Sequence, residues 1–347
     1  MFNKLLGKFS KDLGIDLGTA NTLVYTPDKG IVINEPSVVA INTRNDQILA
    51  VGEEAKKMLG KTPGHIHVIR PLVEGVVSDF EVTEKMLKYF IDKVHSESFT
   101  LIPRPRVVIG IPLDITEVEK KAVEDAAKSA GASQVFLVEE PMAAAIGVRL
   151  PVTESIAVML VDIGGGTTDI VVISLGGSVN WKSLHIAGNT LTNDIMRYIR
   201  EEFNVSIGEQ VAERIKIKIG SATPLKETLK MIVRGRDLIN GLPKEIEVND
   251  SQIRDAMSRS ISQIIHNVKI VLETTPPELV SDIYEHGIIL TGGGALLRGL
   301  DKEVSQATRI PARVADDPLT CVVRGAGILL SDQELLEKVL LPSTREL

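Results

Sequence analysis

The sequence predicts an α/β protein built from two similar halves. Short apolar runs typical of buried strands alternate with segments of helical periodicity along the whole chain. The stretch GIDLGTANTL at 14–23 has a counterpart, VDIGGGTTDI, at 161–170, and each is an apolar run followed by Asp-x-Gly and small residues that include threonine. The length of 347 residues is that of roughly two domains. Each half is therefore expected to hold one sheet with one such loop.

In the first half, apolar runs that end at turn residues predict strands. These runs are residues 13–17, 23–25, 31–33, 106–113 and 135–140. A helix is predicted at 83–98, where apolar residues recur at helical spacing. Another is predicted at 115–132, because Thr116 and Glu119 form a capping box and Gly131 closes the helix. A further helix follows the last strand.

The second half repeats this alternation. The predicted segments are strands at 156–163 and 170–175, a helix near 191–203, a long helix with one apolar face at 253–272, and a strand, glycine turn and helix at 287–300. Pro276 stops the long helix. A last helix is predicted to begin at a capping box formed by Ser331 and Glu334. Residues 34 to about 75 and 204–250 are expected to be smaller insertions.

Composition limits the possible functions. Hydrophobic residues make up 44% of the chain and charged residues 24%, which is typical of a globular protein. A net charge of −7 and only 3% aromatic residues argue against nucleic acid as a partner. The single cysteine, Cys321, excludes an internal disulfide and suits a reducing compartment. No apolar run reaches the roughly 18 residues of a membrane-spanning helix. Lysines interrupt the N-terminal stretch MFNKLLGKFSKD, which excludes a secretion signal, so the expected location is the cytoplasm.

The two related loops are predicted to bind phosphate. Glycine lets backbone N–H groups approach an anion closely, and threonine hydroxyls add donors. Asp16 and Asp162 end the two strands and would repel phosphate unless a divalent cation lay between them. Mg²⁺ keeps several of its waters and bridges phosphate oxygens, so both carboxylates are predicted to hold it through water. The alternative is that the aspartates only order two tight turns.

A third glycine turn, LTGGGALL at 290–297, follows a strand and opens a predicted helix, whose N-terminus would suit a phosphate or a ribose. The sequence GKT at 60–62 is similar to the end of a P-loop. However, Ala55 stands where the first glycine of that motif should be, and the preceding residues are predicted to be helical. Gly60 is expected to end that helix instead. Nucleotide binding of the P-loop type is therefore not predicted.

These motifs together are similar to those of a known superfamily. GIDLGTANTL, VEEPMAAAIG, VDIGGGTTDI and LTGGGALL resemble the phosphate, connect and adenosine motifs of the actin, sugar-kinase and heat-shock chaperone superfamily. NEPSVVA, GKTPGHI, RGRDLINGLP and TPPELVSDI further resemble the MreB family of bacterial actins. The resemblance extends from about residue 11 to about residue 330. It implies an actin-like ATPase fold of two similar lobes, each with a mixed sheet flanked by helices, with ATP and Mg²⁺ in a cleft between them.

The resemblance also implies domain limits and nucleotide-binding residues. Residues 1–150 would form one lobe with a small inserted subdomain at about 34–75, completed by about 316–347. Residues 151–315 would form the other lobe, with an inserted subdomain at about 188–250. The residues implied to bind nucleotide are Asp16, Gly18, Thr19, Ala20, Asn21, Gly164, Gly165, Gly166, Glu213, Arg214, Ile215, Lys216, Gly292, Gly293, Gly294, Ala295 and Leu296. For the stretch AERIKIKIG, which contains four of them, the alternative is a charged helix face.

Hydrolysis needs a water in line with the leaving phosphate. The resemblance makes Glu140 the residue that positions this water, with Thr167 helping to orient it and Asp162 beside the metal. The alternative for Glu140 is charge complementarity at the N-terminus of a helix. After HIAG the family pattern has two acidic residues three apart, where this chain has Asn189 and Thr192. This departure argues against a metal or hinge role at these positions and predicts a turnover that differs from the family's.

The first residues are predicted to contact a membrane. Their apolar side chains recur at helical spacing, with lysines on the other faces, and they are Phe2, Leu5, Leu6 and Phe9. One such helix binds weakly, but a polymer displays many. The stretch FTLIPRP is predicted to add an apolar loop through Phe99, Leu101 and Ile102. The alternatives are a short helix packed on the protein body and an ordinary buried connection.

We therefore expect an ATP-dependent, membrane-associated filament protein that organises cell-wall synthesis and maintains rod cell shape. The resemblance implies a weak ATPase whose hydrolysis weakens the filaments, and a homopolymer of paired protofilaments at the inner face of the cytoplasmic membrane. Membrane elongation and wall-synthesis proteins are the implied partners. The main alternative is a sugar- or acetate-type kinase of the same superfamily, which would need an acceptor site. A heat-shock chaperone would need a C-terminal peptide-binding domain.

Overall fold

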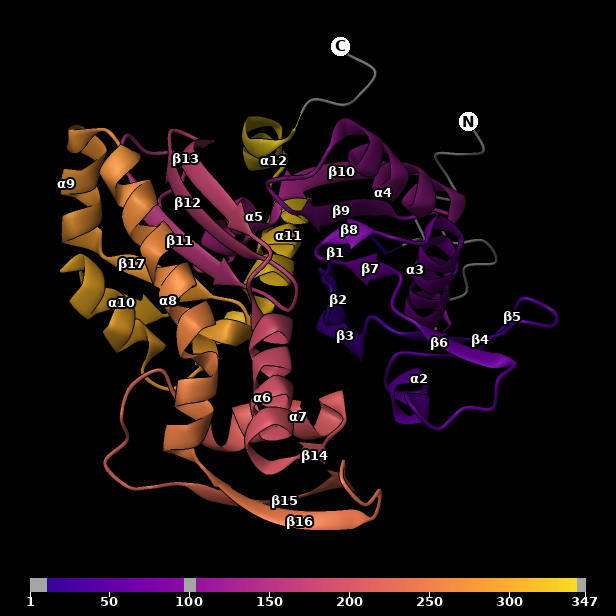
Figure 1. The fold of residues 1–347 in the computed structure, drawn as a ribbon. Helices are drawn as coiled ribbons and strands as arrows, with labels where there is room; N and C mark the ends of the chain where they lie inside the picture. Colours follow the sequence, from indigo (N-terminus) through magenta and orange to yellow (C-terminus); the bar gives the residue numbers. More distant parts are fainter. Residues whose placement is uncertain (1–10, 97–103, 342–347) are drawn as a thin grey trace. The chain divides into compact units, whose positions relative to one another are not determined.

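The chain divides into two compact units (Figure 1). The computed structural model describes residues 11–96 and 104–341. Unit 1 consists of Met1–Ser155, Ser174–Gly177 and Leu319–Leu347. Unit 2 consists of Ile156–Ile173 and Ser178–Pro318. Within the described residues, no helix is both long and apolar enough to cross a bilayer.

The main sheet of unit 1 has five strands. They are β1 (Leu13–Leu17), β2 (Asn21–Thr26), β3 (Gly30–Pro36), β9 (Arg106–Ile111) and β10 (Gln134–Glu139). Their order is β10-β9-β1-β2-β3. The first three strands pair antiparallel, and β1, β9 and β10 pair parallel, so the sheet is mixed. This confirms the predicted strands, with β9 ending at Ile111 rather than at residue 113.

Helices cover both faces of this sheet. They are α3 (Phe80–His95), α4 (Glu117–Ser129), α5 (Glu140–Gly147), α11 (Cys321–Ser331) and α12 (Gln333–Val339). Leu13 and Ile15 pack in one core with Phe90 of α3. The alternate residue Gly14 faces α11, since a Cβ there would lie 3.0 Å from the carbonyl carbon of Ala326. The predicted capping box of α4 is confirmed, because Thr116 and Glu119 cap each other reciprocally.

The helices α5 and α11 pack at very short range. A Cβ on Gly147 would lie 2.0 Å from the carbonyl oxygen of Cys321, and a Cβ on Gly325 would lie 1.8 Å from that of Ala143. Both glycines are therefore required by the close approach of the two backbones. This contact fixes the position of α5, whose first residue is the candidate Glu140.

A smaller sheet belongs to unit 1. It contains β4 (Val39–Asn42), β5 (Gln47–Val51) and β6 (Ile66–Ile69) in the order β5-β4-β6, with α2 (Glu53–Met58) beside it. The strands β7 (Leu72–Val73) and β8 (Val76–Val77) form a short hairpin. Gly60 follows α2 with φ of 72°, a left-handed conformation that ends the helix as predicted and that glycine adopts without strain.

The main sheet of unit 2 repeats the arrangement of unit 1. It contains β11 (Val158–Ile163), β12 (Thr168–Ser174), β13 (Gly177–Leu184), β17 (Ile288–Thr291) and β18 (Ala312–Val314). The order β13-β12-β11-β17-β18 matches that of β3-β2-β1-β9-β10 in unit 1. As there, the first loop joins two antiparallel strands, and the later strands pair parallel. The prediction of two similar halves is confirmed.

Five helices pack around this second sheet. They are α6 (Gly188–Phe203), α7 (Glu209–Ile219), α8 (Asp250–Thr274), α9 (Pro277–His286) and α10 (Leu300–Thr308). Apolar residues of α6, α7 and α8 share one core with alternate residues of β11. Among them, Ile195, Ile215 and Met257 are fully buried. The helix predicted near 191–203 thus begins three residues earlier, at Gly188.

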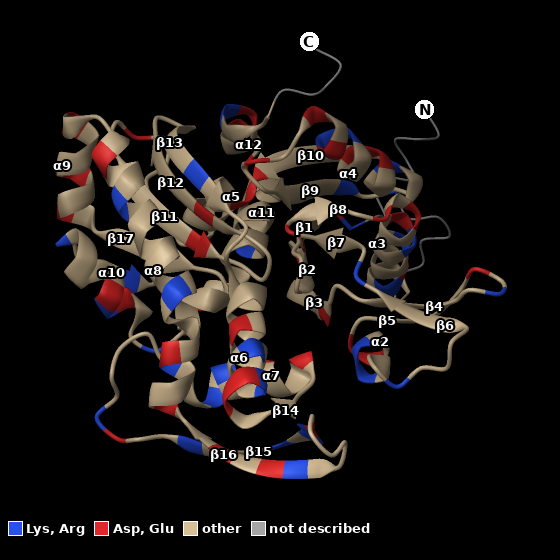
Figure 2. Ribbon diagram, in the orientation of Figure 1, with Lys and Arg blue, Asp and Glu red and all other residues tan. Residues whose placement is uncertain are grey.

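A second small sheet, with the order β14-β15-β16, belongs to unit 2. Its strands are β14 (Val205–Ser206), β15 (Lys230–Asp237) and β16 (Pro243–Asn249). The last two form the predicted hairpin, and Figure 2 shows charged residues of both signs along it. Two cross-strand ion pairs join its strands, Lys230 with Glu247 at 2.8 Å and Arg234 with Glu245 at 2.7 Å.

Two predictions at helix ends are wrong. The glycine turn after β17 does not open an α-helix, because it continues into the 3₁₀ helix η2 (Gly293–Leu296) and α10 begins only at Leu300. The capping box at Ser331 is also absent. Ser331 is the last residue of α11, and Asp332 caps α12 instead by accepting a hydrogen bond from the Leu335 N–H at 3.0 Å.

Candidate functional site

The loop between β1 and β2 carries the first set of predicted residues. Asp16 is half-buried on β1. A Cβ on Gly18 would lie 2.7 Å from the carbonyl oxygen of Asn21 and 3.4 Å from Oδ1 of Asp16. The turn therefore needs glycine, and the Asp16 carboxylate lies directly behind it. Ala20, at the tip, is exposed.

Residues from other segments brace this loop. The Ser37 hydroxyl donates to the carbonyl oxygen of Gly18 at 2.5 Å, and the Ser37 N–H donates to that of Ala20 at 3.0 Å. The N–H of Gly75, in the β7–β8 turn, donates to Oγ1 of Thr19 at 2.8 Å. Sequence reasoning did not select Ser37 as a functional residue, and only its position inside NEPSVVA, a family-like stretch, marks it. These bonds hold the loop in a fixed shape before any ligand binds.

Glu140 and Asp16 both adjoin Gly110 within unit 1. Glu140 is the first residue of α5, half-buried, directly after β10. Its Cγ would be 3.1 Å from a Cβ on Gly110, and Gly110 is the register partner of Asp16 in the β1–β9 pair. Any larger residue at 110 would displace the glutamate. Gly110 therefore leaves room for two carboxylates at one end of the sheet, a role that the sequence did not reveal.

The loop between β11 and β12 carries the second set. Its ends are joined by a hydrogen bond from the Gly164 N–H to the Thr167 carbonyl at 2.9 Å. Asp162 is buried on β11, and its register partners are Asp169 on β12 and Thr291 on β17. Burial, and then the charge of Asp169, raise the pKa of Asp162 to about 7, against a smaller opposing effect of the Thr291 hydroxyl. The charged carboxylate is therefore costly here unless a cation compensates it.

The N-terminus of α6 holds this loop. The Gly188 N–H donates to the Gly164 carbonyl at 3.1 Å, and the Asn189 N–H donates to the Gly165 carbonyl at 2.8 Å. The Thr168 hydroxyl donates to the carbonyl of Ile186 at 2.7 Å. The first N–H groups of a helix have no partner within the helix, so these loop carbonyls satisfy them. Loop and helix form one rigid piece.

The third glycine turn packs directly on Asp162. Gly292 has φ of 77°, and a Cβ there would lie 2.4 Å from the carbonyl oxygen of Ile163 and 2.5 Å from Oδ1 of Asp162. A Cβ on Gly294 would meet Cγ2 of Ile163 at 2.2 Å. The predicted adenosine loop and the second phosphate loop are thus adjacent. In the rest of this turn, Gly293 and Leu296 are exposed and Ala295 is buried.

The helix α7 carries the remaining predicted residues. Lys216 and Glu213 form an ion pair at 2.7 Å, while Arg214 is exposed. Ile215 is fully buried in the core of unit 2, so its side chain offers no surface to a ligand. Arg298, just after the third glycine turn, donates to the carbonyl oxygens of Ile217 at 3.0 Å and Gly220 at 3.1 Å. This arginine ties the end of α7 to the glycine turn.

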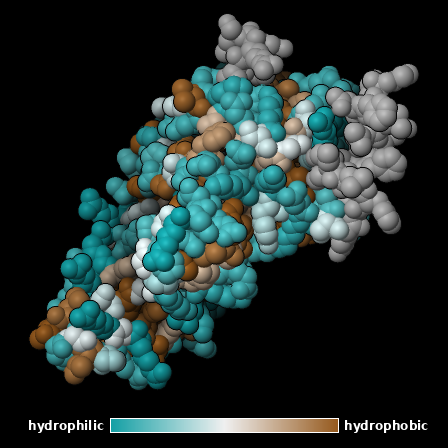
Figure 3. Space-filling view, turned by 90° about the vertical axis from the view of Figure 1, so that its right-hand side faces the viewer, coloured by the Kyte–Doolittle hydropathy of each residue, from teal (hydrophilic) through white to brown (hydrophobic). Residues whose placement is uncertain are grey.

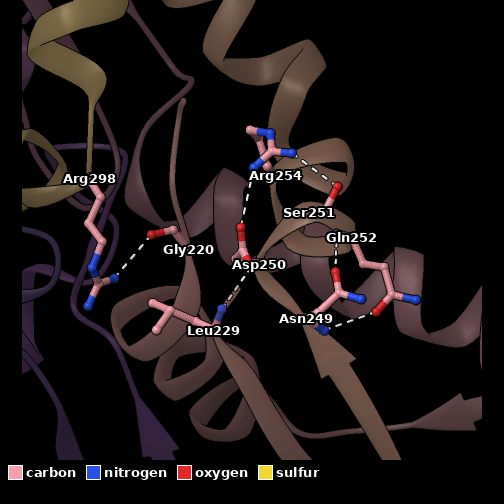
Figure 4. Close-up of polar contacts among 8 residues, drawn as sticks. All are labelled: Gly220, Leu229, Asn249, Asp250, Ser251, Gln252, Arg254 and Arg298. Carbon is pink, nitrogen blue, oxygen red and sulfur yellow. Dashed lines mark hydrogen bonds and ion pairs between the residues drawn. The ribbon is translucent and has the colours of Figure 1, made fainter. Parts of the chain in front are cut away.

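Figure 4 shows the Arg298–Gly220 bond beside the polar contacts at the start of α8. Asp250 is buried and accepts from the Leu229 N–H at 2.9 Å and from Arg254 at 3.5 Å. These contacts fix the base of the β15–β16 hairpin. They lie outside the set of residues that the sequence predicted.

The structure thus gathers the predicted residues into two groups, one in each unit. In unit 1, Asp16, the loop 18–21 and Glu140 lie around the end of β1. In unit 2, Asp162, the loop 164–167, α7 and the turn 292–296 adjoin one another. No group of three His, Cys, Asp or Glu side chains in the described residues is suited to ligate a metal directly. The predicted membrane residues Phe2, Leu5, Leu6, Phe9, Phe99, Leu101 and Ile102 lie outside the described residues.

Comparison with known proteins gives consistent matches over nearly the whole chain. The family described as MreB/Mbl protein matches residues 10–338. Cell shape-determining protein MreB of Escherichia coli is 52% identical over 333 residues, covering 94% of this chain and 95% of that protein. Cell shape-determining protein Mbl of Bacillus subtilis is 47% identical over 330 residues, covering 95% of this chain and 98% of that protein.

Solved structures give the same result. MreB5 of Spiroplasma citri bound to ADP has a TM-score of 0.89 at 37% identity, covering 95% of this chain and 98% of that one. The same protein bound to AMPPNP has a TM-score of 0.89 at 38% identity, covering 94% and 98%. A MamK double helical filament has a TM-score of 0.77 at 24% identity, covering 92% and 98%, which is a likeness of fold alone.

Proposed function

This chain belongs to the MreB/Mbl family, and on that premise we propose that it binds and slowly hydrolyses ATP and assembles into membrane-associated filaments that organise wall synthesis. Its fold is actin-like, with a mixed sheet flanked by helices in each lobe. The relatives are cell shape-determining proteins, so the function is that of an actin-like rod-shape protein. These relatives do not favour the alternative of a small-molecule kinase.

The single observation that carries the nucleotide proposal is the repeated loop. Each unit has a carboxylate on its first strand and a glycine-containing turn after it, at the same point of the same sheet topology. The high pKa of Asp162 supports a nearby cation, because a buried carboxylate next to Asp169 is unfavourable without one. Asp16 and Asp162 would hold Mg²⁺ through water, and the ion would supply positive charge against the phosphates.

The protein's own residues would do the rest. Backbone N–H groups of the loops 18–21 and 164–166 bind phosphate oxygens, and the turn 292–296 with Glu213 and Lys216 receives the nucleoside. Glu140 accepts a hydrogen bond from the attacking water, and Thr167 helps to orient it. This assignment of Glu140 is supported by its contact with Gly110, which is the register partner of Asp16. MreB5 has been solved with ADP and with AMPPNP, which supports a nucleotide as the ligand of this chain.

The test separates binding from hydrolysis. Glu140→Ala should bind ATP as the unchanged protein does and release phosphate at least about 100-fold more slowly, the scale of a lost general-base contribution. Matched to it, Glu139→Ala changes the neighbouring carboxylate at the end of β10 and should leave release within about two-fold. Equal phosphate release from all three proteins would remove Glu140 from the mechanism.

Self-association is supported by an exposed apolar surface on unit 2. The turn of the β15–β16 hairpin carries Leu238, Ile239 and Leu242, of which Ile239 is 81% exposed. Figure 3 shows hydrophobic surface at the lower end of the molecule, where this hairpin lies. We assign this tip to a contact between copies of the chain, since exposed apolar side chains of this size gain stability by burial. Sedimentation with ATP should show Ile239→Asp in the supernatant and Ile239→Val in the pellet. Pelleting of both variants would exclude the tip from the filament contact.

Membrane association is supported by one hydrogen bond in unit 1. The backbone N–H of Lys11 donates to Nε2 of His95 at 3.0 Å, and Nδ1 of the same ring bonds to the Ile91 carbonyl at 2.7 Å. Lys11 comes two residues after Phe9 of the predicted anchor, and His95 comes four residues before Phe99 of the predicted apolar loop, so the chain enters both predicted lipid-contacting segments from neighbouring points of unit 1. Together they would give two weak contacts per subunit, which a filament multiplies.

Liposome sedimentation tests the membrane proposal. The full chain should pellet with anionic vesicles, and a chain lacking residues 2–9 should pellet much less. Lys4→Ala combined with Lys8→Ala should weaken pelleting in a salt-dependent way. Equal pelleting of the full and shortened chains would exclude the N-terminal anchor. Binding to membrane elongation and wall-synthesis proteins belongs to the same proposal and would follow from location at the inner face of the cytoplasmic membrane.

A further inference from the structure

One buried threonine of unit 2 makes contacts that the nucleotide proposal does not explain. Thr192, on α6, is 2% exposed. Its hydroxyl lies 2.5 Å from Oε2 of Glu213 and 3.0 Å from Nζ of Lys216, both on α7, and 3.0 Å from the Gly188 carbonyl oxygen. The single hydroxyl hydrogen goes to Glu213, which is the nearer and the charged acceptor, while Lys216 donates to the hydroxyl oxygen. A carboxylate there would carry a second negative charge next to Glu213, whereas a hydroxyl donates to it.

Lys216 has its ammonium group fully engaged by the protein. It donates to the Gly188 carbonyl at 2.7 Å, to Thr192 at 3.0 Å and to Oε2 of Glu213 at 2.7 Å. An ammonium has three hydrogens, so these bonds use all of its donors. Lys216 therefore links α6 to α7 through its hydrogen bonds. Because the Gly188 N–H donates to the Gly164 carbonyl, the same bonds also connect α7 with the second phosphate loop.

Glu213 is held through one oxygen only. Both Thr192 and Lys216 donate to Oε2, which fixes the carboxylate in one rotamer. In the described part of the chain, no protein donor bonds to its other oxygen, Oε1, and the side chain is 41% exposed. The result is a fixed acceptor that points one oxygen outward. Fixing it in advance saves the entropy that a mobile glutamate would lose on binding a donor.

The chemistry of a nucleotide determines which group can use this acceptor. Phosphate oxygens only accept hydrogen bonds at neutral pH and would be repelled by the carboxylate. The donors of ATP are the ribose hydroxyls and the adenine amino group. The Glu213 cluster is joined to the phosphate loop through Lys216, Gly188 and Gly164, and the sugar is the part of a nucleotide next to its phosphates. The ribose is therefore the nearest donor.

We propose that Thr192 is a positioning residue that sets the selectivity of this site for ribonucleotides by holding Glu213 against the sugar hydroxyls. The inference rests on the proposed ATP binding and adds to it the part of the ligand that is recognised. A site built to bind a hydroxyl rejects the analogue that lacks it, because its own polar group is then left without a partner. Thr192 acts through Glu213 and does not itself contact the ligand.

The experiment is titration calorimetry of the full chain with ATP, 2′-deoxy-ATP and 3′-deoxy-ATP. The unchanged protein should bind ATP at least about ten-fold more tightly than one of the deoxy analogues, the scale of a hydrogen bond to a charged group. In Thr192→Val the ratio should fall below about two-fold, because only Lys216 then holds Oε2 and the Glu213 carboxylate can turn about that single bond. Thr192→Ser keeps the hydroxyl and should keep the ratio. Thr190→Val is the matched control, since it removes a hydroxyl from the same helix without touching Glu213 or Lys216.

The readout is a ratio of affinities, so a general loss of stability does not imitate the effect. If Thr192→Val does not fold, Thr192→Ala removes the same hydroxyl without a branched side chain. An unchanged ratio in the folded variant that lacks the hydroxyl overturns the inference. So does equal binding of ATP and both deoxy analogues by the unchanged protein, while the proposed function survives that result. Absence of ATP binding altogether refutes the proposed function itself.

Discussion

Replacing Asp162 with asparagine should stabilise the nucleotide-free protein. Asp162 is 7% exposed and lies opposite Asp169 in the β11–β12 pair, and its pKa is raised from 3.8 to about 7. Above pH 3.8 the unfolded chain loses this proton while the folded chain keeps it. The carboxylate therefore destabilises the fold progressively between pH 3.8 and about 7, and by a constant amount at higher pH. Asparagine has the same shape and carries no charge at any pH.

The magnitude follows from the shift of about three pKa units, each worth about 1.36 kcal/mol. Compared with the unchanged protein, Asp162→Asn should gain about 2 kcal/mol of unfolding free energy at pH 5 and about 4 kcal/mol at pH 8. This gain in unfolding free energy is an upper limit, because the Thr291 hydroxyl stabilises the carboxylate of Asp162 and an amide replaces that carboxylate in the variant. The same variant should lose Mg²⁺-dependent ATP binding. Asp162 would thus lower the stability of the nucleotide-free fold while being required for Mg²⁺-dependent ATP binding.

The assay is urea unfolding of the metal-free and nucleotide-free full chain at pH 5, 6, 7 and 8. Asp255→Asn is the matched control, since Asp255 is an exposed aspartate on a helix of the same unit. The control should change the unfolding free energy by less than about 0.5 kcal/mol, as a surface substitution does. A gain for Asp162→Asn that is equal at pH 5 and pH 8, or a variant that is less stable at pH 8, would refute the argument from burial and Asp169.

Three further predictions concern packing. Gly325→Ala should destabilise unit 1 by about 1–3 kcal/mol in thermal unfolding, because its Cβ would lie 1.8 Å from the Ala143 carbonyl, and unchanged stability would contradict the close α5–α11 contact. Gly292→Ala should destabilise unit 2 by about 2–4 kcal/mol and weaken ATP binding, because φ at this position is 77° and the added Cβ would collide with Asp162. Normal ATP binding by this variant in calorimetry would contradict the prediction. Phe90→Ala should cost about 3–5 kcal/mol in urea unfolding, because Phe90 is fully buried in the core of unit 1, and a loss under 1 kcal/mol would show that its site collapses.

Local patterns in the sequence were enough to predict most strands of the two main sheets and most helices, but not β13 and β18 at the edges of the second sheet. Apolar runs and turn residues gave the strands β1 and β11, and the reciprocal cap of Thr116 and Glu119 gave the start of α4. The repeated Asp-x-Gly loop predicted the equal topology of the two sheets, because the same local unit stands at the same point of each. These features depend on residues close together in the chain.

Features that depend on distant residues were not predictable in this way. The helix α6 begins at Gly188 although Ala187 has no capping side chain, because carbonyls of the loop 164–165 satisfy its first N–H groups. Ser331 and Asp332 are both good caps, and only the packing of α11 decides between them. In the site, Ser37 and Gly110 act through tertiary contacts. Neither carries a sequence pattern of its own.

The most direct test of the whole account is calorimetric titration of ATP into the nucleotide-free full chain, with Mg²⁺ and again with a chelator. We expect the unchanged protein to bind one ATP per chain saturably and only in the presence of Mg²⁺. We expect both Asp16→Asn and Asp162→Asn to lose this binding. Binding that is unaffected by the chelator, or the absence of binding of any purine triphosphate, would contradict the account.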